Sequence, residues 1–243
     1  QSAGPWEALP PRLGCERSYA IGKALYRTGR WSDGAPHLAR AGEDCKGYDR
    51  VLGASSLYLL GTLRARKGQH TLASQAYDLL AKTYPDHSMA DDALTRGGVS
   101  LYEIGAEKEA AERWLTALDN YPSGDTTAEA ARRLALWYYD TKAVGQARVV
   151  AKRVSEMPGN HSDDVRAWGA YWHARWLMYP DVADPEAPND NAQQWADGIL
   201  AMGQACERYT SSLYGSLAYN RLAEVAPERA NTCIDRARGV ASS

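Results

Sequence analysis

The sequence contains no phenylalanine and only four cysteines and four methionines among its 243 residues. Its aromatic residues are 15 tyrosines and 8 tryptophans, so every ring carries a polar group and suits a half-buried surface. No apolar run approaches the roughly 20 residues that a membrane-spanning helix needs, and we expect no membrane span. Lysine and arginine number 28 against 30 acidic residues, which excludes the basic surplus of a nucleic-acid-binding protein.

Recognisable catalytic and ligand-binding motifs are missing as well. The sequence has no phosphate-binding P-loop, no GxGxxG and no GxSxG. None of the five histidines lies four residues from another, the spacing at which one helix face binds a metal. Asp91 and Asp92 are adjacent, and adjacent side chains diverge on a helix. We therefore predict no metal site, no cofactor and no catalytic residue in this chain; whether the parent protein is an enzyme stays open.

Internal repetition is the strongest feature that is present. Tyr84–Pro85 recurs as Tyr121–Pro122, 37 residues later, and Gly68 recurs as Gly105 at the same spacing. Lys142 occupies the next equivalent position. A fixed period of about 34 to 40 residues is typical of tetratricopeptide-like repeats, in which each helical hairpin buries its apolar face only against its neighbours.

Apolar residues within these repeats follow the helical period. They lie at i, i+3, i+4, i+7 and i+11 in one segment and recur on the same face 37 residues later, as Ala73, Ala76, Tyr77, Leu80 and Tyr84, and then as Ala110, Trp114, Ala117, Leu118 and Tyr121. No segment alternates with the period of a strand. The sequence thus predicts an all-α fold, a right-handed superhelix (α-solenoid) of antiparallel helix pairs with tetratricopeptide-like repeats.

The pattern divides into six hairpins. We expect their first helices at 15–28, 50–67, 88–104, 126–141, 163–179 and 211–225, and their second helices at 32–45, 70–84, 107–121, 143–156, 191–209 and 228–238. Two first helices are expected to begin at capping boxes, Ser88 with Asp91 and Thr126 with Glu129. Residues 1–12, which hold three prolines, are expected to form an irregular lead-in, and residues 13–243 a single solenoid.

One long loop interrupts the fifth hairpin. Residues 179–190 contain three prolines and four acidic residues, where other hairpins need only a few residues between their helices. Such a loop could bind calcium or a partner. The more frequent role of a long surface loop is a solvated insertion, and we favour that interpretation.

An aromatic stripe marks the helix expected before that loop. Trp168, Trp172 and Trp176 lie at i, i+4 and i+8, with Tyr171 and Arg175 beside them. Exposed rings at this spacing could stack against sugars and form a glycan or partner surface. The alternative is that these rings pack inside the solenoid, where the small residues of the same helix leave a thin core.

Four stretches carry a resemblance to a known family: residues 84–94, residues 121–135, the Tyr-Trp-His-Ala-Arg of 171–175 and the Tyr-Gly-Ser-Leu-Ala of 214–218 with Arg221 and Leu222. In this order they resemble the N-terminal superhelical region of soluble lytic murein transglycosylases. The resemblance covers most of residues 15–227 and adds Tyr214 to the candidate glycan or partner surface.

The resemblance implies a role without catalysis for this chain. Family members cleave the bond between N-acetylmuramic acid and N-acetylglucosamine in a C-terminal lysozyme-like domain, with a Glu-Ser motif followed by Gly-Leu-Met-Gln. Neither motif occurs in this sequence, so no catalytic residue is transferred to any position. The resemblance implies a periplasmic scaffold that supports a downstream catalytic domain and helps to hold peptidoglycan glycan strands. The alternative is a non-enzymatic tetratricopeptide adaptor of envelope assembly or cell division, with envelope proteins as partners.

The cysteines form one pair near each end of the chain. They are either buried thiols of a cytosolic protein or two disulfides of an exported one. Cys15 and Cys45 each lie about 15 residues from a turn near residue 30, so an antiparallel hairpin brings them level. Cys206 and Cys233 flank the first helix of the sixth hairpin. We predict the disulfides Cys15–Cys45 and Cys206–Cys233, which agree with export to the periplasm, as does a start at glutamine rather than methionine.

Overall fold

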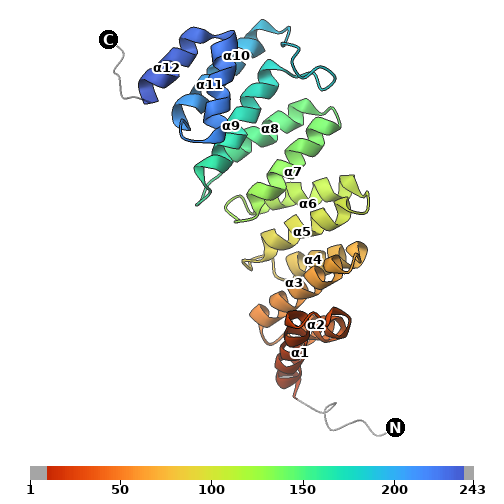
Figure 1. Cartoon of the computed structure of the whole chain (residues 1–243). Coiled ribbons are helices and arrows are strands. Elements are labelled where there is room, and N and C mark those ends of the chain that lie inside the picture. The colour runs from red at the N-terminus through yellow and green to blue at the C-terminus, as the bar shows by residue number, and fades with distance from the viewer. Residues whose placement is uncertain (1–9, 238–243) are drawn as a thin grey trace. The chain divides into compact units, whose positions relative to one another are not determined.

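The computed structural model describes residues 10–237, which form twelve α-helices and no strand. The helices are α1 (Pro11–Arg27), α2 (Trp31–Asp44), α3 (Arg50–Arg66), α4 (His70–Thr83), α5 (Ala90–Tyr102), α6 (Glu107–Asn120), α7 (Thr127–Asp140), α8 (Val144–Ser155), α9 (Asp163–Met178), α10 (Ala192–Arg208), α11 (Leu213–Val225) and α12 (Pro227–Ala237) (Figure 1). Each begins and ends within four residues of its expected bounds. The all-α architecture of helical hairpins is confirmed.

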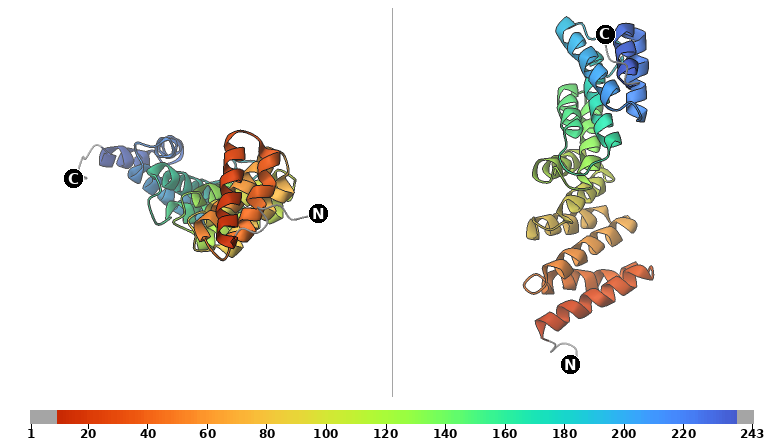
Figure 2. Two further views of the ribbon diagram at one scale, coloured as in Figure 1. Left: turned by 90° about the horizontal axis from the view of Figure 1, so that it is seen from below. Right: turned by 90° about the vertical axis from the view of Figure 1, so that its left-hand side faces the viewer.

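The chain divides into two compact units, residues 1–127 and 128–243. Within each unit the helices follow one another side by side in chain order (Figures 1 and 2). The first helices of successive hairpins also touch, α1 with α3 and α3 with α5 in the first unit, and α9 with α11 in the second. The single solenoid over residues 13–243 stays a prediction. Most of the expected lead-in lies outside the described residues, and α1 already begins at Pro11.

In two hairpins of the first unit, a glycine on the first helix packs against an aromatic ring on the second helix. A Cβ atom at Gly61 would lie 2.7 Å from Cε1 of Tyr77, and one at Gly98 would lie 2.7 Å from Cδ1 of Trp114. The rings are 2% and 1% exposed, and the Trp114 indole donates to the Thr95 carbonyl at 3.2 Å. The equivalence of Tyr77 and Trp114 in the repeat thus reflects one packing arrangement used twice.

The turns inside the hairpins also repeat. Gly29, Gly68 and Gly105 have φ angles of 75°, 70° and 76°, in the left-handed region that glycine adopts without steric cost. Lys142, at the next equivalent position, has a φ of 64°. A lysine therefore adopts a backbone conformation that favours glycine.

Polar contacts between hairpins of the first unit span almost one repeat. Nη2 of Arg113 donates to Oδ2 of Asp78 at 2.9 Å, 35 residues away, and the Tyr121 hydroxyl donates to the Pro85 carbonyl at 2.8 Å, 36 residues away. Because these separations nearly equal the repeat period, such bonds join equivalent positions of successive hairpins.

The capping box expected at Ser88 is wrong. Met89 is the N-cap of α5, without a side-chain hydrogen bond. Asp91, which is 4% exposed, instead accepts hydrogen bonds from the Thr126 backbone N–H and hydroxyl at 3.3 and 3.2 Å. Glu129, expected to complete the second box, accepts from Arg133 at 2.8 Å. The local motif failed because Asp91 satisfies a donor of the next hairpin rather than one of its own helix.

Both predicted disulfides are present. Cys15–Cys45 joins α1 to α2 with a Cα separation of 4.9 Å, and Cys206–Cys233 joins α10 to α12 with a Cα separation of 6.0 Å. All four cysteines are at most 1% exposed.

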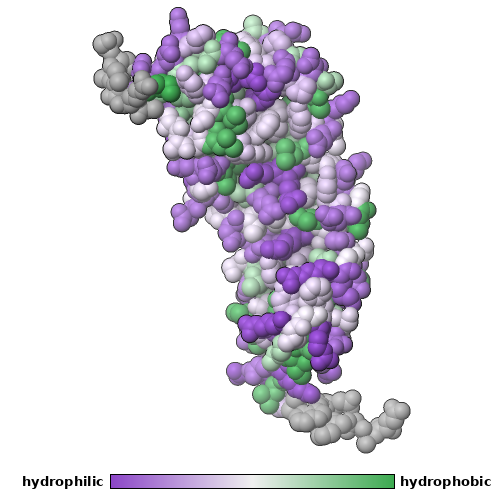
Figure 3. Space-filling model, viewed as in Figure 1, coloured by the Kyte–Doolittle hydropathy of each residue, from purple (hydrophilic) through white to green (hydrophobic). Residues whose placement is uncertain are grey.

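Among the described residues, none of the helices has the length and apolar character needed to cross a membrane. On the face shown in Figure 3, small hydrophobic areas are interspersed with polar ones.

Candidate functional site

The tryptophan stripe of α9 is mostly interior. Trp168, Tyr171 and Trp176 are 3%, 7% and 2% exposed, and Trp176 stacks on Tyr139 of α7 with ring centroids 5.3 Å apart. Trp172 remains partly exposed. Packing inside the second unit therefore accounts for Trp168 and Trp176, and the accessible part of the stripe is Trp172.

The second unit brings Tyr214 to this stripe. The Tyr171 ring lies 5.4 Å from the Trp172 ring and 5.8 Å from the Tyr214 ring, measured between centroids. Tyr214 is partly exposed at the start of α11, where the Ser212 hydroxyl caps the helix by accepting from the Gly215 N–H at 3.0 Å. The two C-terminal motif stretches, 43 residues apart, thus share one aromatic cluster.

An arginine pair lies beside the aromatic cluster. Arg175 of α9 and Arg221 of α11 lie over the Tyr179 ring at 4.8 and 5.0 Å from its centroid. Glu186 of the long loop contacts both, at 2.5 Å from Nη2 of Arg175 and 2.9 Å from Nη1 of Arg221. Hydrogen bonding to Arg175, helped by the charge of Arg221, lowers the pKa of the Glu186 carboxyl. The loop is therefore attached through Glu186, a contact that the interpretation as a solvated insertion did not anticipate.

A hollow in the second unit lies between α8, α9 and α10. It has a volume of about 330 Å³ and is lined by Lys152, Glu156, His173 and Arg208 among others. A ring nitrogen of His173, Nδ1, lies 3.2 Å from the Arg148 carbonyl oxygen. Burial lowers the pKa of this imidazole, so His173 is neutral near pH 7 and contributes no charge to the hollow.

The first unit has a larger cavity, of about 910 Å³, at its two Tyr-Pro junctions. We call it the junction groove; its acidic lining is Asp86, Asp91, Asp92 and Asp125. One carboxylate oxygen from each of Asp91, Asp92 and Asp125 lies within 4.8 Å of the others. Carboxylates so placed could hold a hard cation such as Ca²⁺. Asp125 was not expected beside Asp91 and Asp92. It follows Asp91 by 34 residues along the sequence, which is close to one repeat period.

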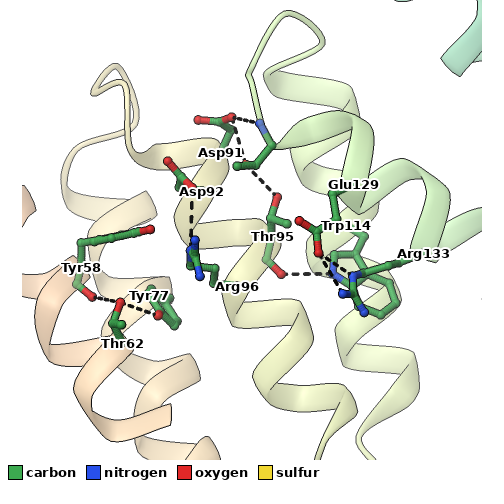
Figure 4. A network of polar contacts seen from close by, with 11 residues as sticks. Tyr58, Thr62, Tyr77, Asp91, Asp92, Thr95, Arg96, Trp114, Glu129 and Arg133 are labelled. Carbon is green, nitrogen blue, oxygen red and sulfur yellow. Dashed lines mark hydrogen bonds and ion pairs between the residues drawn. The ribbon is translucent and has the colours of Figure 1, made fainter. Parts of the chain in front are cut away.

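A network of polar contacts next to that groove joins α3, α4 and α5 of the first unit (Figure 4). Thr62 and the Tyr77 hydroxyl are hydrogen-bonded at 3.0 Å, and burial raises the pKa of Tyr77 to about 12. Arg96 lies over the Tyr58 ring at 5.5 Å and 3.8 Å from Asp92. These side chains come from α3, α4 and α5, so they hold neighbouring hairpins in register.

Comparison with known proteins agrees with this architecture. The tetratricopeptide repeat family model matches residues 55–87, from α3 through the first Tyr-Pro junction. No curated protein matches the sequence. The described part of the chain is therefore a tetratricopeptide-like helical repeat scaffold.

Two solved structures are similar to it. One is described as a kinesin light chain from Podosopora anserina with nearly identical TPR-like repeats; it is 12% identical with a TM-score of 0.47, and the match covers 83% of this chain and 98% of that one. The other is the TPR2AB domain of yeast Sti1 in complex with pHSP90, 13% identical with a TM-score of 0.36, covering 92% of this chain and 98% of that one.

Proposed function

We propose that this chain is the helical scaffold region of a periplasmic lytic transglycosylase. In this proposal it holds peptidoglycan glycan strands while a separate downstream domain cleaves them. The observation that carries the proposal is the aromatic cluster of the second unit, because Trp172 and Tyr214 belong to the two motif stretches of the resemblance and meet through Tyr171.

The cluster has the chemistry that a sugar ring needs. Trp172 and Tyr214 are partly exposed and can present a ring face to the apolar side of a sugar, while indole and phenol groups hydrogen-bond to its hydroxyls. Arg175 and Arg221 add donors next to the rings. The surface is thus suited to binding rather than to bond cleavage.

Export to the periplasm is the second part of the proposal. Both cysteine pairs are bonded and buried, and such bonds form and persist in oxidising compartments. Together the two bonds include every cysteine of the sequence.

The test combines binding and turnover on the whole chain. We expect solubilised glycan strands to bind in isothermal titration, and purified sacculi to release no 1,6-anhydro-muropeptides above a heat-killed control. Trp172→Ala should weaken binding by about 2- to 10-fold, the value of one aromatic stack. Leu200→Ala, at a 46% exposed residue of the same unit, is the matched control. Wild-type chain that binds no glycan, or product above background, contradicts the proposal.

The junction groove favours a second candidate, an adaptor of envelope assembly or cell division. Its acidic lining would complement a basic segment of a protein partner. Sequencing the gene beyond Ser243 separates the candidates, because only the first requires a following domain with the Glu-Ser and Gly-Leu-Met-Gln motifs.

A further inference from the structure

Glu186 occupies the space between two arginines that come from different helices. Its Oε1 lies 2.5 Å from Arg175 and its Oε2 lies 2.9 Å from Arg221, so both carboxylate oxygens are used. The Arg175 and Arg221 side chains are only 11% and 20% exposed, whereas Glu186 is 61% exposed. The cations thus belong to the body of the second unit, and the carboxylate approaches them from outside.

Contacts other than Glu186 hold the two arginines in place. Both guanidinium groups lie over the Tyr179 ring, at 4.8 and 5.0 Å, and Arg221 also pairs with Glu224 at 3.0 Å. The Nη1 atom of Arg175 is buried without a hydrogen-bond partner. The pair is therefore prearranged for an anion and retains donor capacity that Glu186 leaves unused.

The base of the loop is fastened independently of Glu186. The Asn189 backbone N–H donates to the Met178 carbonyl at 2.7 Å, and its amide donates to the Leu177 carbonyl at 2.8 Å and to Gln194 at 3.0 Å. These bonds tie the end of the loop to the end of α9 and the start of α10. Glu186 can therefore leave the arginines without opening the packing of those two helices.

Once Glu186 leaves, the charge at the arginine pair is unbalanced. Arg221 then keeps its pair with the 62% exposed carboxylate of Glu224, and Arg175 loses its ion pair with Glu186. A second carboxylate is the group that restores the balance, because guanidinium groups bind carboxylates through two parallel hydrogen bonds.

We propose that Arg175 and Arg221 form a carboxylate-binding site for an acidic peptide segment of a partner protein, and that Glu186 occupies this site in cis until the partner displaces it. The acidic peptide is favoured because the internal occupant is itself a short, acidic, proline-rich stretch of chain. The inference concerns peptide binding and holds whether or not the chain binds glycan.

The test measures competition between the loop and a probe. The probe is fluorescein-labelled tetraglutamate, titrated into the full-length chain and followed by fluorescence anisotropy, with labelled tetraglutamine as the neutral probe. Glu186→Gln should raise the affinity for tetraglutamate about tenfold, because it removes a competitor held at a high effective concentration. Asp190→Asn removes one charge from the same loop and should change the affinity less than about twofold.

A double variant and a spectroscopic readout complete the test. Adding Arg221→Gln to Glu186→Gln should abolish the gain. Equal effects of Glu186→Gln and Asp190→Asn, or a gain that survives loss of Arg221, would overturn the proposal. If Glu186→Gln does not fold, the spectroscopic measurement on the wild-type chain tests the proposal instead. Tetraglutamate should then shift the Nε–H signals of Arg175 and Arg221 and leave that of the exposed Arg30 in place, and no shift at the pair at millimolar probe contradicts the site.

Discussion

The two units are built from the same kind of helical hairpin but differ in the polar contacts that join their hairpins. In the first unit, polar contacts 35 or 36 residues apart join equivalent positions, as in Asp78–Arg113 and Pro85–Tyr121. In the second unit, a contact of the same span, Glu186–Arg221, starts from a loop that no other hairpin has. Regular repeats build the scaffold. The loop of residues 179–190 interrupts them and brings Glu186 to Arg175 and Arg221, next to the aromatic cluster.

The largest difference between the units should be in what a tryptophan contributes to stability. Trp114 is 1% exposed against Gly98, so Trp114→Ala should cost about 3–5 kcal/mol through lost burial and the cavity left behind. Trp172 is partly exposed, and Trp172→Ala should cost about 1–2 kcal/mol. Urea unfolding of both variants measures the two costs. Equal costs would show that Trp172 belongs to the core and not to a binding surface.

The disulfides should contribute equally to the two units. Their loops are nearly the same length, with sequence separations of 30 and 27 residues. Chain entropy predicts that each bond stabilises the fold by about 3–4 kcal/mol. We expect Cys15→Ser with Cys45→Ser, and Cys206→Ser with Cys233→Ser, to lower the unfolding free energy alike. A loss confined to one pair would mean that the other closes a loop that is already restricted in the unfolded chain.

Acid should weaken the second unit through His173. Burial lowers the pKa of His173 in the folded protein, so the unfolded chain takes up this proton first as the pH falls. Stability is therefore full above the unfolded pKa of about 6.5 and declines as the pH falls through it towards the folded pKa, by at most about 1.4 kcal/mol per pH unit. His173→Gln should flatten this decline between pH 7 and 5. An unchanged slope in His173→Gln would show that this imidazole does not cause the decline.

The smallest effect tests the repeated turn. Lys142 has a φ of 64°, in the same left-handed region as Gly29, Gly68 and Gly105 of the first unit. Lys142→Gly should stabilise the protein by about 0.5–1 kcal/mol, because relief of the left-handed strain exceeds the added entropy of the unfolded chain. A thermal melt should rise by about 1–4 °C. Unchanged or lower stability would mean that the lysine side chain makes a compensating contact.

The sequence was sufficient for the helices and the disulfides because both follow local rules. The helical period and the Tyr-Pro junctions placed every helix within four residues. Symmetry about one turn paired Cys15 with Cys45. The helices and Cys15–Cys45 depend on residues of one hairpin, where spacing along the chain fixes distance in space, whereas Cys206–Cys233 joins α10 to α12 of the next hairpin.

The candidate sites were less predictable because they depend on contacts between hairpins. A capping pattern could not show that Asp91 accepts from Thr126 rather than capping its own helix. The 3.6-residue period placed Trp168 and Trp176 on one face but could not tell a buried face from an exposed one. The acidic composition of the loop gave no sign that Glu186 pairs with two arginines. The repeat period offered one usable signal, since Glu186 and Arg221 lie 35 residues apart.

The central proposal is that the chain binds glycan through Trp172 and Tyr214 of the second unit and not through the first unit. The direct measurement follows the indole N–H signals of the eight tryptophans while solubilised glycan strands are added to the whole chain. The Trp172 signal should move, while that of Trp114, whose indole donates to Thr95 inside the first unit, should stay. A stationary Trp172 signal at saturating glycan, or shifts confined to tryptophans of the first unit, would contradict the claim.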